Sequence, residues 1–440
     1  MSEPSFLTGQ SESTQPTQAT ASTTAHSKSS ESTSSGWQAT GYEGPYLAVE
    51  DLTVRFPTAD GMVQAVTDLS YTLEPGRTLG IVGESGSGKS VSSMAIMGLH
   101  DTKRTYMSGS IRVGGREVIG LSNNEMQDLR GSEVAMIFQD PLTSLHPFYS
   151  IGNQISEAYR VHNKGSKAQA KAKAVEMLDR VGIPQARSRV DDYPHQFSGG
   201  MRQRAMIAMS LVNDPNLLIA DEPTTALDVT VQAQILDLLQ ELQRDFNSAV
   251  IMITHDLGVV AEMADEVLVM YGGRGVEHGP TKELLTHPEM PYTWGLLSSV
   301  PDVTASTDTR LLPIPGNPPS LLHPPSGCPY HPRCPHRDKV PGDLCRTELP
   351  ELVPGNRGAL HLKRCHLANP DMIYETEILP EILPDLVDVV LADSQAPADP
   401  ADPVYGADPD ANARTDEAAQ GAATTTPTTP TPPTTQKAGE

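Results

Sequence analysis

The sequence predicts an α/β fold organised around a phosphate-binding loop, and two observations lead to this prediction. Residues 83–90 fit the pattern G-x-x-x-x-G-K-[ST] without a gap. The apolar run 78–82 before them is typical of a buried strand, and residues 91–97 after them are typical of a helix. This strand–loop–helix order places a bound phosphate at a helix N-terminus. The residues of the loop are Gly83, Glu84, Ser85, Gly86, Ser87, Gly88, Lys89 and Ser90.

Each residue type in the loop suits a phosphate group. The three glycines allow backbone N–H groups to converge on phosphate oxygens because no Cβ stands in the way. The Lys89 side chain is long enough to reach the outer phosphates, and the Ser90 hydroxyl is a ligand for Mg²⁺. The sequence therefore predicts a nucleotide-binding protein.

Composition excludes several other classes. The 440 residues carry a net charge of −23, and residues 371–440, with fourteen acidic and two basic residues, contribute −12 of it. A nucleic-acid partner is not expected, since no basic excess is present. No run of 18 or more apolar residues occurs, so we expect the chain not to span a membrane by itself. Residues 1–45 are rich in Ser, Thr and Gln, and the chain beyond about 392 is rich in Ala, Asp, Pro and Thr. Both are predicted to be disordered.

The elements follow in order. Strands are predicted over residues 47–56, 63–73, 109–113, 134–138, 217–222 and 250–255, and a helical segment over about 147–194. The strand 217–222 ends in Asp221 and Glu222, which after a phosphate loop suit Mg²⁺ binding and the activation of water. The strand 250–255 ends in His255, which alone is more often structural than catalytic. Phe56 is either a core aromatic or an adenine-stacking residue, and periodicity does not separate the two.

Taken together, these segments resemble an ABC-transporter ATPase cassette. Gln139, Ser198-Gly199-Gly200, Asp221-Glu222, Ala226-Leu227-Asp228 and His255 follow Lys89 in the order and approximate spacing of that family, over about residues 46–300. The resemblance implies an α/β fold with a RecA-like core, an antiparallel β subdomain and a helical subdomain at about 140–197. The cassette is expected to be followed by a small cysteine-containing C-terminal extension at 301–370 and by a mostly disordered tail at 371–440.

The resemblance also implies the roles of individual residues. Gly83 to Ser90 cradle ATP, Phe56 stacks on the adenine, and Ser90, Asp221 and Gln139 serve Mg²⁺. Glu222 polarises the attacking water and His255 contacts the γ-phosphate. Ser198, Gly199 and Gly200 cap the ATP held by an opposite cassette, and Asp228 lies in the loop that crosses the dimer interface. Met201 stands where the family usually has Gln, which matches a variant found in peptide-permease ATPases.

The region after the cassette resembles the same subfamily, the ATPase subunits of oligopeptide and dipeptide permeases. The supporting segments are 290–297, 314–319 and 327–335. The implied partners are two transmembrane permease subunits, a second and different ATPase subunit and, indirectly, an extracytoplasmic peptide-binding protein. The implied location is the cytoplasmic face of the cell membrane. Related nickel and other small-solute importers share these features, so the cargo stays open. A soluble ABC ATPase without a transport role is a more remote alternative, because neither long heptads nor a second phosphate loop occurs.

All four cysteines, Cys328, Cys334, Cys345 and Cys365, fall in the extension. In a cytosolic chain clustered thiols suggest metal ligation rather than disulfides. The gaps of five, ten and nineteen residues lack the C-x₂-C pair common at zinc sites. Four thiolates suit a [4Fe–4S] cluster, which several peptide-permease ATPases of this cysteine pattern carry. Zinc and four unligated cysteines are the alternatives.

Overall fold

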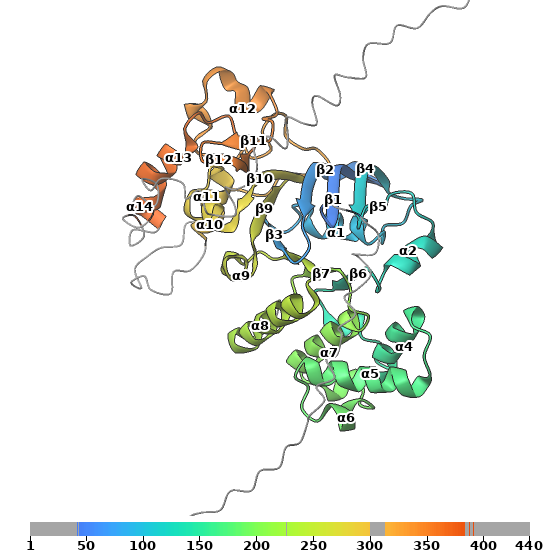
Figure 1. Cartoon of the computed structure of the whole chain (residues 1–440). Coiled ribbons are helices and arrows are strands. Elements are labelled where there is room, and N and C mark those ends of the chain that lie inside the picture. The colour runs from blue at the N-terminus through green and yellow to red at the C-terminus, as the bar shows by residue number, and fades with distance from the viewer. Residues whose placement is uncertain are drawn as a thin grey trace, which may run out of the picture.

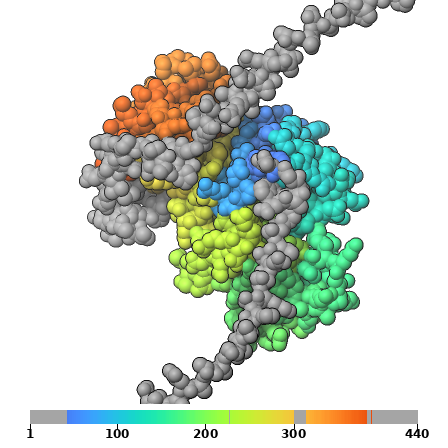
Figure 2. Space-filling view, viewed as in Figure 1, coloured from blue at the N-terminus to red at the C-terminus, as the bar shows by residue number. Residues whose placement is uncertain are grey.

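The computed structural model describes residues 42, 44–225, 227–299, 313–382, 387 and 390. The segments predicted to be disordered, 1–45 and the chain beyond about 392, lie almost entirely outside these residues, as does Ala226. Within them the chain forms two sheets with helices around them (Figure 1). In the space-filling view the helical subdomain (green) and the C-terminal extension (orange) lie at opposite ends (Figure 2).

The smaller sheet is antiparallel and contains the segment before the phosphate loop. Its strands, in spatial order, are β2 (Gly61–Leu73), β1 (Leu47–Thr58), β4 (Tyr106–Val113) and β5 (Arg116–Glu117). Apolar residues of this sheet, including Leu52 and Ile111, share one core with α1 (Lys89–Ile96) and with one face of the larger sheet. The strands predicted over 47–56, 63–73 and 109–113 are confirmed.

The larger sheet has the spatial order β11 (Val353–Gly355), β12 (Gly358–Lys363), β10 (Arg274–Pro280), β9 (Glu266–Tyr271), β3 (Thr78–Val82), β8 (Ala249–Ile253), β7 (Leu217–Asp221) and β6 (Val134–Ile137). The strands from β9 to β6 pair in parallel, and every residue of β3, β6, β7 and β8 is buried. Burial on both faces explains their continuous apolar sequences. Because β3, β8 and β7 pair in parallel, their carboxyl ends lie at the same edge of the sheet.

Helices fill the range predicted for the helical subdomain, about 140–197, and α7 continues beyond it to Leu211. The subdomain contains α3 (Pro141–Ser144), α4 (Ile151–His162), α5 (Lys167–Arg180), α6 (Ala186–Arg189), a 3₁₀ turn (Pro194–Gln196) and α7 (Gly199–Leu211). Ser166 and Gln169 begin α5 with reciprocal side-chain caps, and Ala170, Ala174, Met177 and Leu178 bury one face of it.

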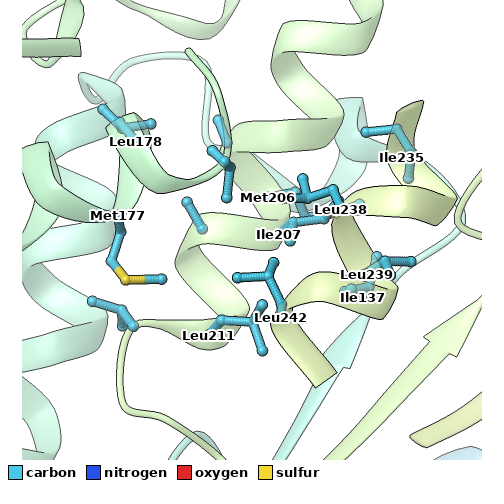
Figure 3. Close-up of a cluster of buried hydrophobic side chains, with 14 of the residues drawn as sticks. Ile137, Met177, Leu178, Met206, Ile207, Leu211, Ile235, Leu238, Leu239 and Leu242 are labelled. Carbon is cyan, nitrogen blue, oxygen red and sulfur yellow. The ribbon is translucent and has the colours of Figure 1, made fainter. Parts of the chain in front are cut away.

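The core of the helical subdomain continues into the α/β core without a break. Figure 3 shows Met177 and Leu178 of α5 facing Met206, Ile207 and Leu211 of α7, with Ile235 to Leu242 of α8 (Val229–Phe246) and Ile137 of β6 on the other side. Because α7 contacts both groups, a shift of the helical subdomain must repack side chains against α8. The other helices of the cassette are α2 (Asn123–Leu129), α9 (Leu257–Met263), α10 (Thr281–Thr286) and α11 (Pro291–Leu297).

The C-terminal extension adds to the sheet of the cassette instead of folding apart from it. Its strand β12 pairs antiparallel with β10, and a third core joins its apolar residues to α11 and β9. Its helical parts are short: 3₁₀ turns Arg337–Lys339 and Pro341–Asp343, α12 (Leu344–Thr347), α13 (Pro370–Ile373), a π turn Tyr374–Ile378 and α14 (Leu379–Ile382). Tyr374 and Leu379 are fully buried. The predicted tail boundary at 371 thus falls inside α13, because these apolar side chains pack on the extension.

A buried ionic cluster joins the extension to the cassette. His361 Nε2 of β12 lies 2.9 Å from Glu277 Oε1 of β10, and Lys363 Nζ lies 2.8 Å from Glu289 Oε2. Burial acts to lower the pKa of His361, but the hydrogen bond and the charge of Glu277 outweigh it, so this pKa is raised above the usual value. The protonated imidazole therefore helps to hold β12 on β10.

We predict that protonation of His361 stabilises the fold. A raised folded-state pKa gives stability that is complete below the unfolded pKa of about 6.5 and is lost as the pH rises through the folded-state pKa. The melting temperature of the wild type, relative to His361→Gln, should accordingly fall as the pH is raised from about 6 to about 9. Parallel melting curves across this range would contradict the assignment.

Candidate functional site

The phosphate loop joins β3 to α1 in a conformation that depends on its glycines. Gly83, Gly86 and Gly88 have φ values of 148°, 79° and 106°, which side-chain-bearing residues rarely adopt. A Cβ on Gly83 would collide with the carbonyl oxygen of Met270, and one on Gly88 would lie 2.5 Å from that of Ala65. The loop therefore keeps its backbone free to approach a ligand while β9 and β2 pack closely behind it.

Lys89 folds back over the loop that contains it. Its Nζ donates hydrogen bonds to the carbonyl oxygens of Gly83 at 2.6 Å and Glu84 at 3.1 Å. Burial lowers the pKa of Lys89, and the nearby carboxylates, Glu222 foremost, act in the opposite direction. The ammonium group is thus held against the first two residues of the loop. In this motif the lysine binds phosphate oxygens.

Ser90 and Asp221 form the second part of the site. The Ser90 hydroxyl donates to Asp221 Oδ1 at 3.1 Å, across the gap between α1 and the end of β7. Burial raises the pKa of Asp221, and the hydrogen bond from Ser90 opposes this effect. A buried carboxylate beside a hydroxyl is a suitable donor set for Mg²⁺, whose charge would keep the carboxylate ionised.

Glu222 is the centre of a third group. Its Oε2 accepts hydrogen bonds from Gln139 Nε2 at 2.8 Å and from the Thr225 hydroxyl at 2.9 Å. His255 Nδ1 lies 3.5 Å from the other oxygen, Oε1. The backbone of Glu222 is left-handed, with φ of 47°, and its N–H donates to the carbonyl oxygen of Ile253 at 2.9 Å. The structure thus brings Gln139, Glu222 and His255 together from the ends of β6, β7 and β8.

Thr225 was missed by the sequence analysis. It lies three residues after Glu222 and holds the same carboxylate oxygen as Gln139. The Pro-Thr-Thr that follows Asp221-Glu222 was the available signal, because hydroxyl residues in a tight turn bond back to nearby acceptors.

The residues expected to face an opposite cassette lie at the starts of α7 and α8. Ser198 caps α7 by accepting from the Met201 N–H at 3.3 Å, and Asp228 caps α8 by accepting from the Val231 N–H at 3.0 Å. A Cβ on Gly199 would meet nothing within 4 Å, whereas one on Gly200 would touch Val231. Ser198 to Gly200 therefore form an open helix start that lies beside the first turn of α8.

Phe56 lies at the end of β1 and is half-buried. Its ring makes an edge contact with His100, with centroids 5.4 Å apart and planes at 69°. His100 in turn bonds the carbonyl oxygen of Val91 in α1. The aromatic pair thus lies next to the helix that begins at the phosphate loop. Stacking on adenine stays a prediction.

The prediction of a metal centre at the four cysteines is not supported by the geometry. Cys328, Cys334, Cys345 and Cys365 all contribute to the core of the extension, and the Cys328 N–H donates to the Cys345 carbonyl oxygen at 2.9 Å. Within the residues that the structure describes, no three His, Cys, Asp or Glu side chains are close enough to hold a metal ion. Burial raises the pKa of Cys328, Cys334 and Cys365 to about 12, which favours the protonated thiol over the thiolate that a metal requires.

Fold and site together define a P-loop ATPase of the ABC type. The family model described as "ABC transporter" matches residues 66–225, and the one described as "Oligopeptide/dipeptide transporter, C-terminal region" matches residues 276–340. The second match begins in β10 and ends in the extension that carries the cysteines.

Similar sequences also indicate the ATP-binding proteins of peptide transport. The chain is 56% identical over 294 residues to the oligopeptide transport ATP-binding protein OppD of Salmonella typhimurium, covering 67% of this chain and 87% of that one. It is 51% identical over 324 residues to OppD of Haemophilus influenzae, covering 74% and 98%. It is 54% identical over 286 residues to the dipeptide transport ATP-binding protein DppD of Lactococcus lactis, covering 65% and 82%. The chain belongs to the ATP-binding proteins of the oligopeptide/dipeptide ABC transporter family.

Proposed function

We propose that this ATPase subunit powers the import of dipeptides or oligopeptides, using the residues gathered at the carboxyl edge of the larger sheet. The observation that carries the proposal is the convergence of Lys89, the Ser90–Asp221 pair and Glu222 at one edge. The family supplies the substrates, ATP with Mg²⁺, and the type of cargo. Nickel or another small solute is the alternative cargo.

In the proposed mechanism the loop binds the phosphates and Glu222 activates water. The backbone N–H groups of the phosphate loop and Lys89 would bind the phosphates. Ser90, Asp221 and Gln139 would hold the Mg²⁺ ion, whose charge would neutralise the phosphates. Glu222 accepts the proton of the attacking water, since its carboxylate is fixed by Gln139 and Thr225. His255, whose Nδ1 lies 3.5 Å from Glu222 Oε1, would contact the γ-phosphate.

We predict that Glu222→Gln separates binding from hydrolysis. The amide keeps the size of the side chain but cannot accept a proton, so hydrolysis should fall by a factor of about 10²–10⁴. The affinity for ATP should stay near that of the wild type, because Lys89 and the loop glycines are untouched. Turnover with labelled ATP and equilibrium binding measure the two quantities. Wild-type turnover in this variant would remove Glu222 from the role of general base.

The proposed assembly contains two cassettes, two transmembrane permeases and, outside the membrane, a peptide-binding protein. Ser198 to Gly200 of one cassette would complete the ATP site of the other, with Asp228 at the interface, and the second cassette would be a different chain. In the described part of the chain no helix is long and apolar enough to cross a membrane. Attachment at the cytoplasmic face of the membrane would therefore run through the permeases.

An exposed apolar surface next to Gln139 is the proposed docking site for a permease subunit. We call it the docking surface and propose that it comprises the exposed side chains of Phe138, Leu142, Phe148, Tyr149 and Val161, of which Phe148 is 81% and Val161 68% exposed. A groove of about 290 Å³ between β6, α4 and α7 is lined by Phe138 and Val161. Gln139 follows Phe138 directly and bonds Glu222, so movement at this surface reaches the hydrolytic carboxylate.

We predict that removing two side chains of the docking surface weakens assembly. Burying one large apolar side chain contributes about 1.5–3 kcal/mol, so Leu142→Ala with Phe148→Ala should reduce affinity for the permeases by a factor of about ten or more. Co-purification of detergent-solubilised permeases with the tagged chain measures this. Met372→Ala, at an apolar residue 58% exposed on the extension, is the matched control. Equal recovery with both variants would contradict the docking site.

We also propose that the four cysteines hold a [4Fe–4S] cluster with a structural or sensory role. Its support is that the four side chains share one core, together with the cysteine pattern of the family. The thiols would have to move closer and ionise to bind it, which the charge of the iron favours.

Metal analysis of the protein purified without oxygen tests the cluster. We expect about four iron atoms and about four sulfide ions per chain, lost in Cys334→Ser. Zinc in their place, or neither metal, would reject the cluster in favour of a zinc site or of unligated thiols.

A further inference from the structure

A side chain of the C-terminal extension bonds directly to the phosphate loop. Arg333 Nη1 donates to Glu84 Oε2 at 2.6 Å, and Arg333 Nη2 donates to Glu84 Oε1 at 3.0 Å. The two parallel contacts form a fork between guanidinium and carboxylate, the strongest common geometry for an ion pair. The Arg333 side chain is 6% exposed and that of Glu84 26%. Such a pair is screened far less than a surface ion pair.

The remaining donors of Arg333 are engaged as well. Its Nε donates to the carbonyl oxygen of Pro315 at 2.8 Å, Nη2 donates to that of Ile314 at 3.3 Å, and Nη1 donates to the Tyr271 hydroxyl at 3.2 Å. These contacts come from the extension and from β9. These contacts fix the guanidinium independently of Glu84. The Arg333 side chain therefore loses little rotamer freedom when it pairs with Glu84.

A second contact fixes the backbone of the same residue. The Glu84 N–H donates to the Tyr292 hydroxyl of α11 at 2.8 Å. The rings of Tyr271, Tyr292 and Tyr330 pack together, with centroids 4.4 to 5.4 Å apart. Tyr330 and Arg333 belong to one turn, in which the N–H groups of Arg333 and Cys334 both donate to the Tyr330 carbonyl oxygen. One turn of the extension thus supports the first half of the phosphate loop.

The contacts of Arg333 and Tyr292 with Glu84 also affect the position of Lys89, the lysine expected to bind phosphate. The carbonyl oxygens of Gly83 and Glu84 both accept from Lys89 Nζ, so the place of the ammonium group depends on the peptide units that Arg333 and Tyr292 hold. We propose that Arg333 is a positioning residue of the ATP site, acting through Glu84 to keep the phosphate loop in its ATP-binding conformation. The extension is then a working part of the ATPase.

Equilibrium ATP binding to the purified full-length chain tests this proposal. We expect Arg333→Ala to raise the Kd for ATP about tenfold, because the phosphate loop loses a charge-assisted contact that holds it in place. Glu84→Gln, which removes the charge without altering the extension, should raise the Kd in the same direction. Arg333→Lys should have a smaller effect than Arg333→Ala, because lysine keeps the charge but loses the fork.

A double-variant cycle separates positioning from a general loss of structure. If Arg333 acts through Glu84, Arg333→Ala combined with Glu84→Ala should bind ATP no more weakly than the worse single variant. Arg337→Ala is the matched control, since Arg337 is exposed in the same region and lies 3.8 Å from Asp338. Its Kd should equal that of the wild type. Circular dichroism spectra of the variants should match that of the wild type, which would show that each variant is folded.

The proposal would be overturned by a wild-type Kd in both Arg333→Ala and Glu84→Gln. It would also be overturned if the effects of the two alanine substitutions multiplied as independent losses. The proposal rests on ATP binding by the phosphate loop, which Lys89→Ala tests separately. A wild-type Kd in Lys89→Ala would reject the phosphate-loop assignment itself, whereas loss of binding there with no effect at Arg333 rejects the positioning role alone.

Discussion

The parallel pairing of β3 with β8, and of β8 with β7, is the constraint on which the site depends. Parallel strands end at the same edge, so the phosphate loop, the two carboxylates after β7 and His255 after β8 meet there. The hydrogen bond from Ser90 to Asp221 spans this edge. These strands are buried and apolar, and most of the residues of the ATP site lie in the loops that follow them.

The same sheet links the site to both ends of the molecule. On one side, β6 leads through Gln139 to the helical subdomain, whose core is continuous with α7 and α8 (Figure 3). On the other side, β10 pairs with β12 of the extension, and Arg333 of the extension forms an ion pair with Glu84 of the phosphate loop. Glu222 accepts a hydrogen bond from Gln139, next to the helical subdomain, and Glu84 pairs with Arg333 of the extension, so both ends of the molecule contact carboxylates of the ATP site.

Much of the cassette could be predicted because its signals are local. The phosphate loop, the pair Asp221-Glu222 and the apolar strands each lie within a few residues, where glycine spacing and hydrophobic runs indicate structure directly. The contact of Arg333 with Glu84 joins positions 249 residues apart, and nothing in either local sequence indicates it. The spatial arrangement of the four cysteines was equally inaccessible, since spacing along the chain does not determine how side chains converge. Continuation of the sheet into the extension depends on strand pairing of the same non-local kind.

Uptake in living cells tests the central claim, that the residues at this sheet edge power peptide import. Cells that depend on this chain would carry the wild type or Glu222→Gln at equal expression, and labelled dipeptides and nickel would be offered separately. The account predicts that peptide uptake falls in the variant while nickel uptake is unchanged. Unchanged peptide uptake together with a loss of nickel uptake would keep the cassette and contradict the assigned cargo.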